Sequence, residues 1–194
     1  MKRIMLVLLS FCNVMTLKAQ QTWNIAKEKD GIKVMVGEVS NSEYYAFKAT
    51  MTVKATENEV VEILKDVNKY PEWFAFTAST KRISHSEIEQ QFFMETDYPW
   101  PYSNECMNYQ MIFEKPQPNK TKIAITGRNQ NVPCKYSFKK AGGYILLESE
   151  KGGVKITYYF HSEPSQRIPT WLINPRIHEM PFQTFEALRE KLSN

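Results

Sequence analysis

Most of the sequence between residues 80 and 162 is a succession of short strand-like runs, and this succession limits the fold more than any other feature. The run at 105–114 is typical, because Met107, Tyr109, Met111 and Phe113 fall on one face of an alternating pattern. Turn-forming residues separate the runs at 116–119, 129–133, 142–143 and 152–153. Short connections favour antiparallel pairing of consecutive strands. We therefore expect six or seven sequential strands among the runs 79–88, 89–98, 105–114, 121–129, 134–140, 143–150 and 154–163.

Two or three further strands precede this region. Residues 22–39 read as a strand, a tight turn at Asp30 and Gly31, and a second strand. Residues 44–55 alternate regularly, with one apolar face formed by Tyr45, Phe47, Ala49, Met51 and Val53.

The period then changes from that of a strand to that of a helix. Thr56 and Glu59 form a capping box, and an apolar stripe at helical spacing predicts a helix over 57–67. Pro71 suits the first turn of a short second helix. Near the C-terminus, Pro169 begins a short apolar segment, and Asn174 is placed to cap a long last helix. Pro181 should kink or loosen that helix.

This order predicts an α+β fold, in which a strongly curved antiparallel sheet of about eight or nine strands wraps around the long C-terminal helix. Two short helices follow the first strands. Such a sheet encloses more volume than one helix fills. The remaining space holds either bulky side chains or a ligand, and the 13% aromatic residues and nine methionines suit both a filled core and an adaptable apolar pocket.

The first 19 residues have the three parts of a secretory signal peptide: basic Lys2 and Arg3, an apolar stretch, and a small residue, Ala19, before Gln20. We therefore expect a signal peptide at 1–19, a single domain at 20–194, and an exported protein, periplasmic or secreted. A lipoprotein attached through Cys12 fits less well, because bulky Phe11 stands where a small residue belongs. An uncleaved anchor is the other alternative.

The net charge limits the possible binding partners, and the cysteine content limits the possible disulfides. The leader carries three of the 25 basic residues and no acidic residue, so the remainder has 22 basic against 21 acidic residues. Without a basic block, we expect no binding of nucleic acid. Cleavage leaves Cys106 and Cys134, which form either one disulfide or two buried thiols.

In order and motifs, residues 22–192 resemble the START family, the steroidogenic-acute-regulatory-protein-related lipid-transfer domains, within the helix-grip superfamily. More narrowly, they resemble its secreted bacterial members. The motifs that carry the resemblance are "WNIAKEKDGIKVMV", "VVEILKDVNKYPEWF", "YPWPYSNE" and "RIPTWLINPRI". The resemblance implies an elongated apolar cavity between the sheet and the last helix, closed by that helix and nearby loops. It also implies binding of a hydrophobic or lipid-like ligand, without chemistry in most members.

One position departs from the family pattern. After the Pro-Trp-Pro segment many members read Ser-Asp-Arg-Asp, whereas this chain reads Ser103-Asn104-Glu105-Cys106. An arginine can hold an anionic head group, whereas a glutamate would repel one. This favours a neutral or cationic ligand over a phospholipid. Alternatively, Glu105 is a solvated residue at the loop edge.

Several residues are candidates for ligand binding, each with ordinary packing as its alternative. Trp100 is held between Pro99 and Pro101 and should form a wall of the cavity mouth. Arg128, if it points inward, needs a partner such as Glu105; outward exposure is the simpler interpretation. Three tyrosines, Tyr109, Tyr158 and Tyr159, can each offer a hydroxyl at the end of an apolar slot, with packing between strands as the alternative. The remaining candidates are the aromatic or apolar residues Phe74, Trp171, Ile177, Met180 and Phe185.

The sequence contains no zinc spacing, phosphate-binding loop, dinucleotide motif or nucleophile elbow. We therefore expect no metal, no cofactor and no enzyme activity, and a monomer that touches membranes transiently. One alternative is a small-molecule enzyme of the polyketide cyclase type, whose acid or base would be sought at Glu105, Arg128 or His161. The other alternative is a filled domain that binds an envelope partner through its surface.

Overall fold

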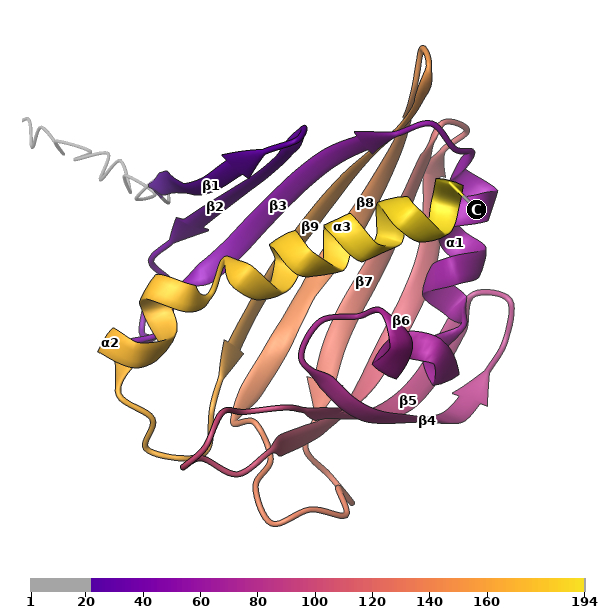
Figure 1. Cartoon of the computed structure of the whole chain (residues 1–194). Helices are drawn as coiled ribbons and strands as arrows, with labels where there is room; N and C mark the ends of the chain where they lie inside the picture. The colour runs from indigo at the N-terminus through magenta and orange to yellow at the C-terminus, as the bar shows by residue number, and fades with distance from the viewer. Residues whose placement is uncertain (1–21, 194) are drawn as a thin grey trace, which may run out of the picture.

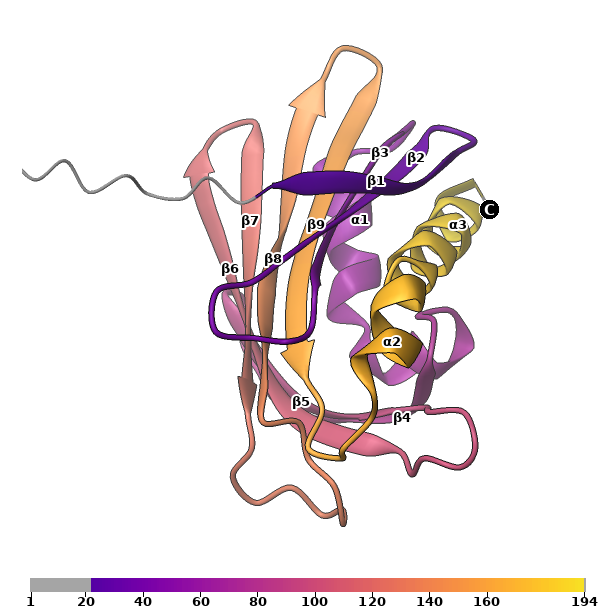
Figure 2. The ribbon, with the colours of Figure 1, turned by 90° about the vertical axis from the view of Figure 1, so that its left-hand side faces the viewer.

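The structure is a computed structural model that describes residues 22–193, and these residues form one strongly curved sheet with its helices on the concave side (Figures 1 and 2). All neighbouring strands pair antiparallel. The strands are β1 Trp23–Lys29, β2 Ile32–Gly37, β3 Ala46–Val53, β4 Thr77–His85, β5 Glu89–Thr96, β6 Glu105–Gln117, β7 Lys120–Arg128, β8 Lys140–Glu150 and β9 Gly153–Glu163. The predicted α+β helix-grip fold is confirmed.

The strand order is β1-β2-β3-β9-β8-β7-β6-β5-β4. The expected meander over β4 to β9 is present, and the first three strands join its far side through the pairing of β3 with β9. The helix α1, Glu57–Lys65, and the 3-10 helix η1, Val67–Glu72, carry the chain across the concave face from β3 to β4. The predicted signal peptide at 1–19 lies outside the described residues.

Local signals at the start of the domain are confirmed. Asp30 and Gly31 have φ angles of 51° and 75°, as a tight hairpin turn between β1 and β2 requires. The capping box is also present, since the Thr56 N–H donates to Glu59 Oε2 at 2.7 Å and the Glu59 N–H donates to Thr56 Oγ1 at 3.3 Å. The helix ends at Lys65, two residues before the predicted end.

Three local predictions are wrong. The short second helix is a 3-10 helix, and Pro71 lies near its end rather than in its first turn. The run predicted as a strand at 134–140 is an irregular loop up to residue 139, with one isolated bridge between Cys106 and Ser137, and Lys140 already belongs to β8. The glycine pair at 142–143 lies inside β8 rather than in a turn. A Cβ at Gly143 would lie 2.0 Å from the carbonyl oxygen of Tyr159, so glycine there permits the close approach of β9.

The C-terminal segment also differs from the prediction. It forms α2, Thr170–Ile173, then the 3-10 helix η2, Asn174–Arg176, and finally α3, Glu179–Ser193. Pro181 is the third residue of α3, where the N–H of the first turn has no acceptor within the helix, so the expected kink has no cause. Asn174 does not cap the last helix; it is the C-terminal cap residue of α2, and its side chain bonds the loop before β3, as described below.

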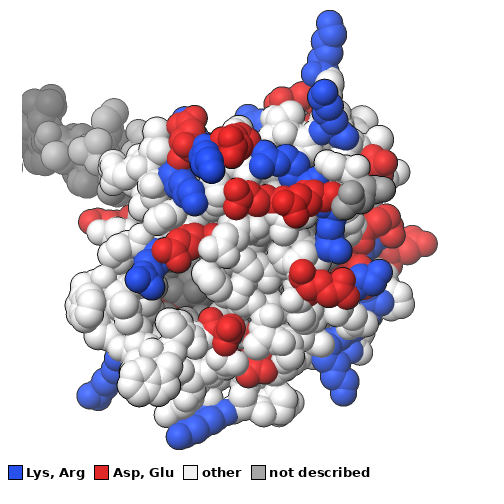
Figure 3. All heavy atoms as spheres, viewed as in Figure 1, with Lys and Arg blue, Asp and Glu red and all other residues white. Residues whose placement is uncertain are grey.

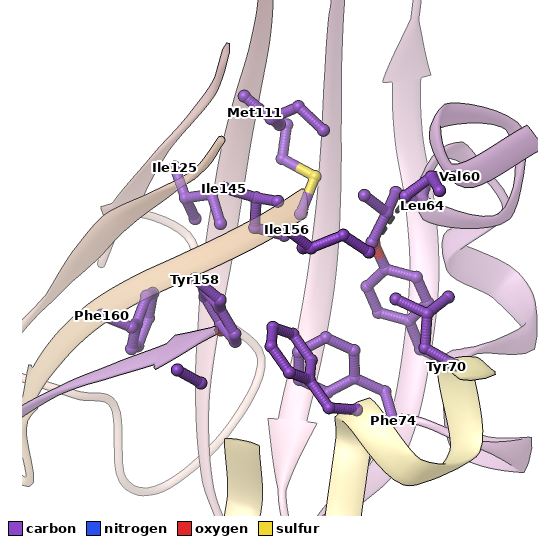
Figure 4. Packing of buried hydrophobic residues seen from close by; sticks show 14 of the residues in the cluster. Val60, Leu64, Tyr70, Phe74, Met111, Ile125, Ile145, Ile156, Tyr158 and Phe160 are labelled. Carbon is purple, nitrogen blue, oxygen red and sulfur yellow. Dashed lines mark hydrogen bonds between the residues drawn. The ribbon is translucent and has the colours of Figure 1, made fainter. Parts of the chain in front are cut away.

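The hydrophobic core lies between the inner face of the sheet and the helices α1 and α3 (Figure 4). The alternation predicted for β3 is confirmed, because Phe47, Ala49, Met51 and Val53 are all buried. From α3, Phe182, Phe185 and Leu188 are buried as well. This packing covers one part of the concave face and leaves the cavity described next.

Candidate functional site

A cavity of about 410 Å³ opens between the concave face of the sheet and the segment 164–180. This volume lies within the range of pockets that hold small organic molecules, about 300–1,000 Å³. Figure 3 shows a hollow at the lower left of this face, bordered mainly by uncharged atoms. Most of the lining is apolar: Phe47, Phe74, Ala75, Phe76, Phe92, Met94, Pro99, Met111, Ile125, Phe138, Ile145, Phe160, Pro164, Ile168, Leu172, Ile173, Ile177 and Met180.

The sheet wall of the cavity is built of packed aromatic rings. The Phe47 ring meets the Tyr158 ring edge to face at 4.9 Å between centroids, and Phe74 approaches Tyr158 from the chain after η1 at 6.3 Å. Figure 4 shows Tyr158 and Phe74 pointing toward one another from the sheet and from the chain after η1. Phe92 and Tyr109 extend the wall, with 5.6 Å between their centroids. Rings packed in this way form a rigid apolar surface.

Tyr109 and Tyr158 are the tyrosines that strands contribute to this lining, beside Tyr70 of η1 and Tyr98 and Tyr102 of the loop between β5 and β6. The hydroxyls of Tyr109 and Tyr158 have no hydrogen-bond partner among the described residues, although both side chains are buried and line the cavity. By contrast, the Tyr70 hydroxyl donates to the carbonyl oxygen of Leu64 at 2.6 Å. Burial raises the pKa of Tyr109 and of Tyr158 above the ordinary 10.0, so both phenols are neutral at physiological pH.

The mouth of the cavity carries the charges of the lining, Asp97, Arg176 and Glu179. It is bordered by the loop between β5 and β6, in which the peptide bond between Trp100 and Pro101 is cis. The indole of Trp100 is 92% exposed, and that of Trp171 in α2 is 74% exposed. Neither ring lines the cavity, but their neighbours Pro99 and Leu172 do. Both indoles therefore stand in solvent beside the opening.

Glu105 is fully buried and fixes the start of the covering segment. Its carboxylate oxygens accept hydrogen bonds from the backbone N–H groups of Ser165 and Gln166, each at 2.9 Å, and from both side chains. The alternative of a solvated Glu105 is therefore wrong. Arg128 does not pair with it, because Arg128 is exposed on the outer face and donates to Gln110 Oε1 at 2.6 Å.

A second anchor holds the covering segment to the loop before β3. The Tyr44 hydroxyl donates to the carbonyl oxygen of Ile168 at 3.0 Å. The side chain of Asn174 accepts from the Tyr45 N–H at 3.1 Å and donates to the carbonyl oxygen of Glu43 at 3.0 Å. These bonds connect residues more than 120 positions apart in the sequence.

A disulfide joins Cys106, the second residue of β6, to Cys134. It ties the loop 129–139 to the sheet beside the cavity, where Phe138 belongs to the lining. Of the two alternatives for this cysteine pair, the structure therefore has the disulfide.

The structure brings four of the candidate ligand residues into the lining: Phe74, Tyr109, Ile177 and Met180. Phe185 is packed in the core instead, and Tyr159 lies on the outer face, where its ring stacks on Tyr144 at 5.3 Å. The contact of any of these residues with a ligand stays a prediction. The alternation of the last strand places Tyr158 and Phe160 on one face, and both line the cavity. Phe47 and Phe92 also belong to the lining, although the sequence did not mark them as candidate ligand residues.

The described residues contain no group of histidine, cysteine and acidic side chains that could hold a metal ion. Among the helices of residues 22–193, none has the length and apolar character needed to cross a membrane.

Comparison with known proteins gives relatives that cover nearly the whole chain, although no family model matches the sequence. An uncharacterized protein of Pseudomonas aeruginosa is 25% identical over 178 residues, which cover 87% of this chain and 86% of that protein. The crystal structure of the STAR-related lipid transfer protein of Xanthomonas axonopodis is 31% identical and has a TM-score of 0.83. That match covers 89% of this chain and 99% of the Xanthomonas chain.

More distant structures share the fold alone. Human StAR-related lipid transfer protein 5 is 14% identical, with a TM-score of 0.76 over 88% of this chain and 86% of its own. The Zhui aromatase/cyclase of a Streptomyces species is 13% identical, with a TM-score of 0.52 over 76% of this chain and 90% of its own.

The second anchor can be tested by replacing Asn174 with alanine. We expect the amide hydrogen of Tyr45 to exchange with solvent about tenfold faster, and the free energy of unfolding to fall by about 1–2 kcal/mol, because two hydrogen bonds are lost. Amide exchange and urea unfolding measure these effects. Thr170→Ala is the control in the same segment, since the Thr170 side chain makes no hydrogen bond within the described chain. Equal exchange at Tyr45 in both variants would contradict the anchor.

Proposed function

Because the chain belongs to the family of STAR-related lipid transfer (START) proteins, we propose that it binds a hydrophobic ligand in the cavity between its curved sheet and the segment 164–180. The observation that carries the proposal is the cavity itself, about 410 Å³ with a largely apolar lining. Transfer of apolar ligand surface from water into such a cavity is favourable by about 25 cal/mol per Å². The volume suits one compact hydrophobic molecule.

The cavity can be tested by filling it. Ile125 lines the cavity from β7, so the larger side chain of Ile125→Trp should occupy ligand space and lower the affinity for the apolar fluorescent probe N-phenyl-1-naphthylamine at least tenfold. Thr126→Trp is the matched control, because Thr126 is the next residue of β7 and is exposed on the outer face. Fluorescence titration measures both affinities. Unchanged affinity in Ile125→Trp, with the protein folded, would count against this site.

We further propose that the protein loads and releases its ligand during transient contact with a membrane. Trp100 and Trp171 support this, since both indoles are exposed beside the mouth and tryptophan favours the interface between water and lipid. The loop that carries Trp100 is tied to the covering segment, because the Ser103 N–H donates to Gln166 Oε1 at 3.0 Å. A membrane that binds both indoles would therefore face the opening.

If the protein contacts membranes through Trp100, this residue should affect the rate of ligand transfer. Trp100→Ser should slow the transfer of N-phenyl-1-naphthylamine between phosphatidylcholine vesicles several-fold, while the equilibrium affinity for the probe stays unchanged, because the indole lies outside the cavity. Stopped-flow fluorescence measures the transfer. Ile88→Ser serves as control, since Ile88 is 66% exposed and precedes β5 at the end opposite the mouth. Equal transfer by both variants would contradict the proposal.

We propose that the protein is exported and acts in the periplasm or outside the cell. The signal peptide predicted at 1–19 supports this, and so does the disulfide between Cys106 and Cys134, because disulfides persist in oxidising compartments. Expression of the full chain in a bacterial host should give an envelope protein whose intact mass corresponds to cleavage before Gln20. A protein that retains the leader, or carries lipid on Cys12, would point to an anchored form.

An enzyme of the cyclase type is the alternative, and the shared fold of the Zhui aromatase/cyclase is the observation that favours it. Its expected mark is an acid or base that faces the cavity with a perturbed pKa. Burial lowers the pKa of His161, but this residue lies outside the lining, with Nε2 3.1 Å from Ser42 Oγ. Glu105 and Arg128 are also absent from the lining. Binding without chemistry is therefore the better supported function. A filled domain is supported least, because it needs a solid interior.

A further inference from the structure

Tyr109 and Tyr158 give the apolar cavity a polar position of its own. Tyr109 comes from β6 and Tyr158 from β9, both on the concave face, with 6% and 4% of their surfaces exposed. Both side chains line the cavity, and neither hydroxyl forms a hydrogen bond with a described residue. The Tyr44 and Tyr70 hydroxyls, in contrast, each donate to a backbone carbonyl oxygen.

Phenylalanine occupies the surrounding positions of the same wall. Phe47 and Phe160 flank Tyr158, with 4.9 and 6.0 Å between ring centroids, and Phe92 packs beside Tyr109. Packing alone does not need the two hydroxyls. Neither hydroxyl oxygen is among the fully buried side-chain atoms that lack a partner, so both can be reached from the cavity. The free donors are therefore accounted for if a molecule inside the cavity bonds them.

The charges around these phenols select a neutral group. Burial, and after it the Glu105 carboxylate, raises the pKa of Tyr109, and the Tyr109 phenol in turn contributes to the raised pKa of Tyr158. Both groups thus remain hydrogen-bond donors and acceptors without charge. Among the lining residues Arg176 is the one cation, and it shares the mouth with Asp97 and Glu179. An anion bound beside Tyr109 would have the Glu105 charge near it and no cation to compensate.

We propose that the ligand is a neutral amphiphile with a hydroxyl or carbonyl oxygen, and that the hydroxyls of Tyr109 and Tyr158 bind this oxygen on the sheet wall of the cavity. The hydrocarbon part of the ligand packs against the surrounding rings and aliphatic side chains. This inference rests on the proposed function, since it names the class of molecule that the cavity binds. It distinguishes that class from fatty-acid anions and phospholipids.

A matched set of probes tests the proposal. Dodecane, 1-dodecanol, 2-dodecanone and dodecanoate are each titrated against the protein loaded with N-phenyl-1-naphthylamine, whose displacement lowers its fluorescence. We expect the alcohol and the ketone to bind about tenfold tighter than dodecane and tighter than dodecanoate, because one or two hydrogen bonds are gained in a dry site. In the double variant Tyr109→Phe with Tyr158→Phe, this preference over dodecane should disappear while dodecane binds as before.

Tyr159→Phe is the control, because Tyr159 follows Tyr158 in β9 but lies on the outer face against Tyr144. This variant should keep the preference for the alcohol and the ketone. Equal binding of dodecane and dodecanol by the unaltered protein, a preference that persists in the double variant, or tighter binding of dodecanoate would each overturn the tyrosine proposal and leave the hydrophobic cavity standing. Failure of every probe, N-phenyl-1-naphthylamine included, would overturn the proposed function and this inference with it.

Discussion

The curvature of the sheet is the constraint on which the rest of the structure depends. Nine antiparallel strands that twist in one direction must curl, and the pairing of β3 with β9 makes them one continuous wall. The helix placed against this wall, α3, has 15 residues and is thus about 22 Å long. It packs over β2 and β3 with Phe182, Phe185 and Leu188, while α1 and η1 pack against β8 and β4, so the concave surface between these helices needs another cover. The segment 164–180 supplies that cover and encloses the cavity beneath it.

Two adjacent residues at the start of β6 fix two loops beside the cavity, one of which begins the covering segment. A buried carboxylate is stable only when its oxygens are bonded, and Glu105 receives donors from both Ser165 and Gln166. The next residue, Cys106, is bonded through the disulfide to the loop 129–139, on which Phe138 lines the cavity. Thus one short stretch of strand positions two loops that lie 28 and about 60 residues further along the chain.

The sequence was informative where the signal was local and failed where the partner was distant. Alternation predicted the inner faces of β3 and β6, and the capping box predicted the start of α1. The role of Glu105 could not be read, because its donors lie 60 residues away, and the glycine pair at 142–143 resembles a turn until the close approach of β9 is known. Aromatic residue type alone does not distinguish a pocket wall from the core or the surface. Burial divides the aromatic residues: Tyr109 lines the cavity, Tyr159 faces outward, and Trp100 stands in solvent.

The covering segment is packed less tightly than the helix that follows it. Neither α2 nor η2 contains a buried residue, whereas α3 buries five. The bonds of Tyr44 and Asn174, together with buried Ile168, hold the stretch between Gln166 and Ile177, so local opening there should cost much less free energy than global unfolding. A ligand in the cavity would touch Leu172, Ile173 and Ile177 from beneath. If the proposed ligand binds there, these contacts would be lost when the segment opens, so binding and closure would stabilise each other, and a membrane that competes for the same segment would favour release.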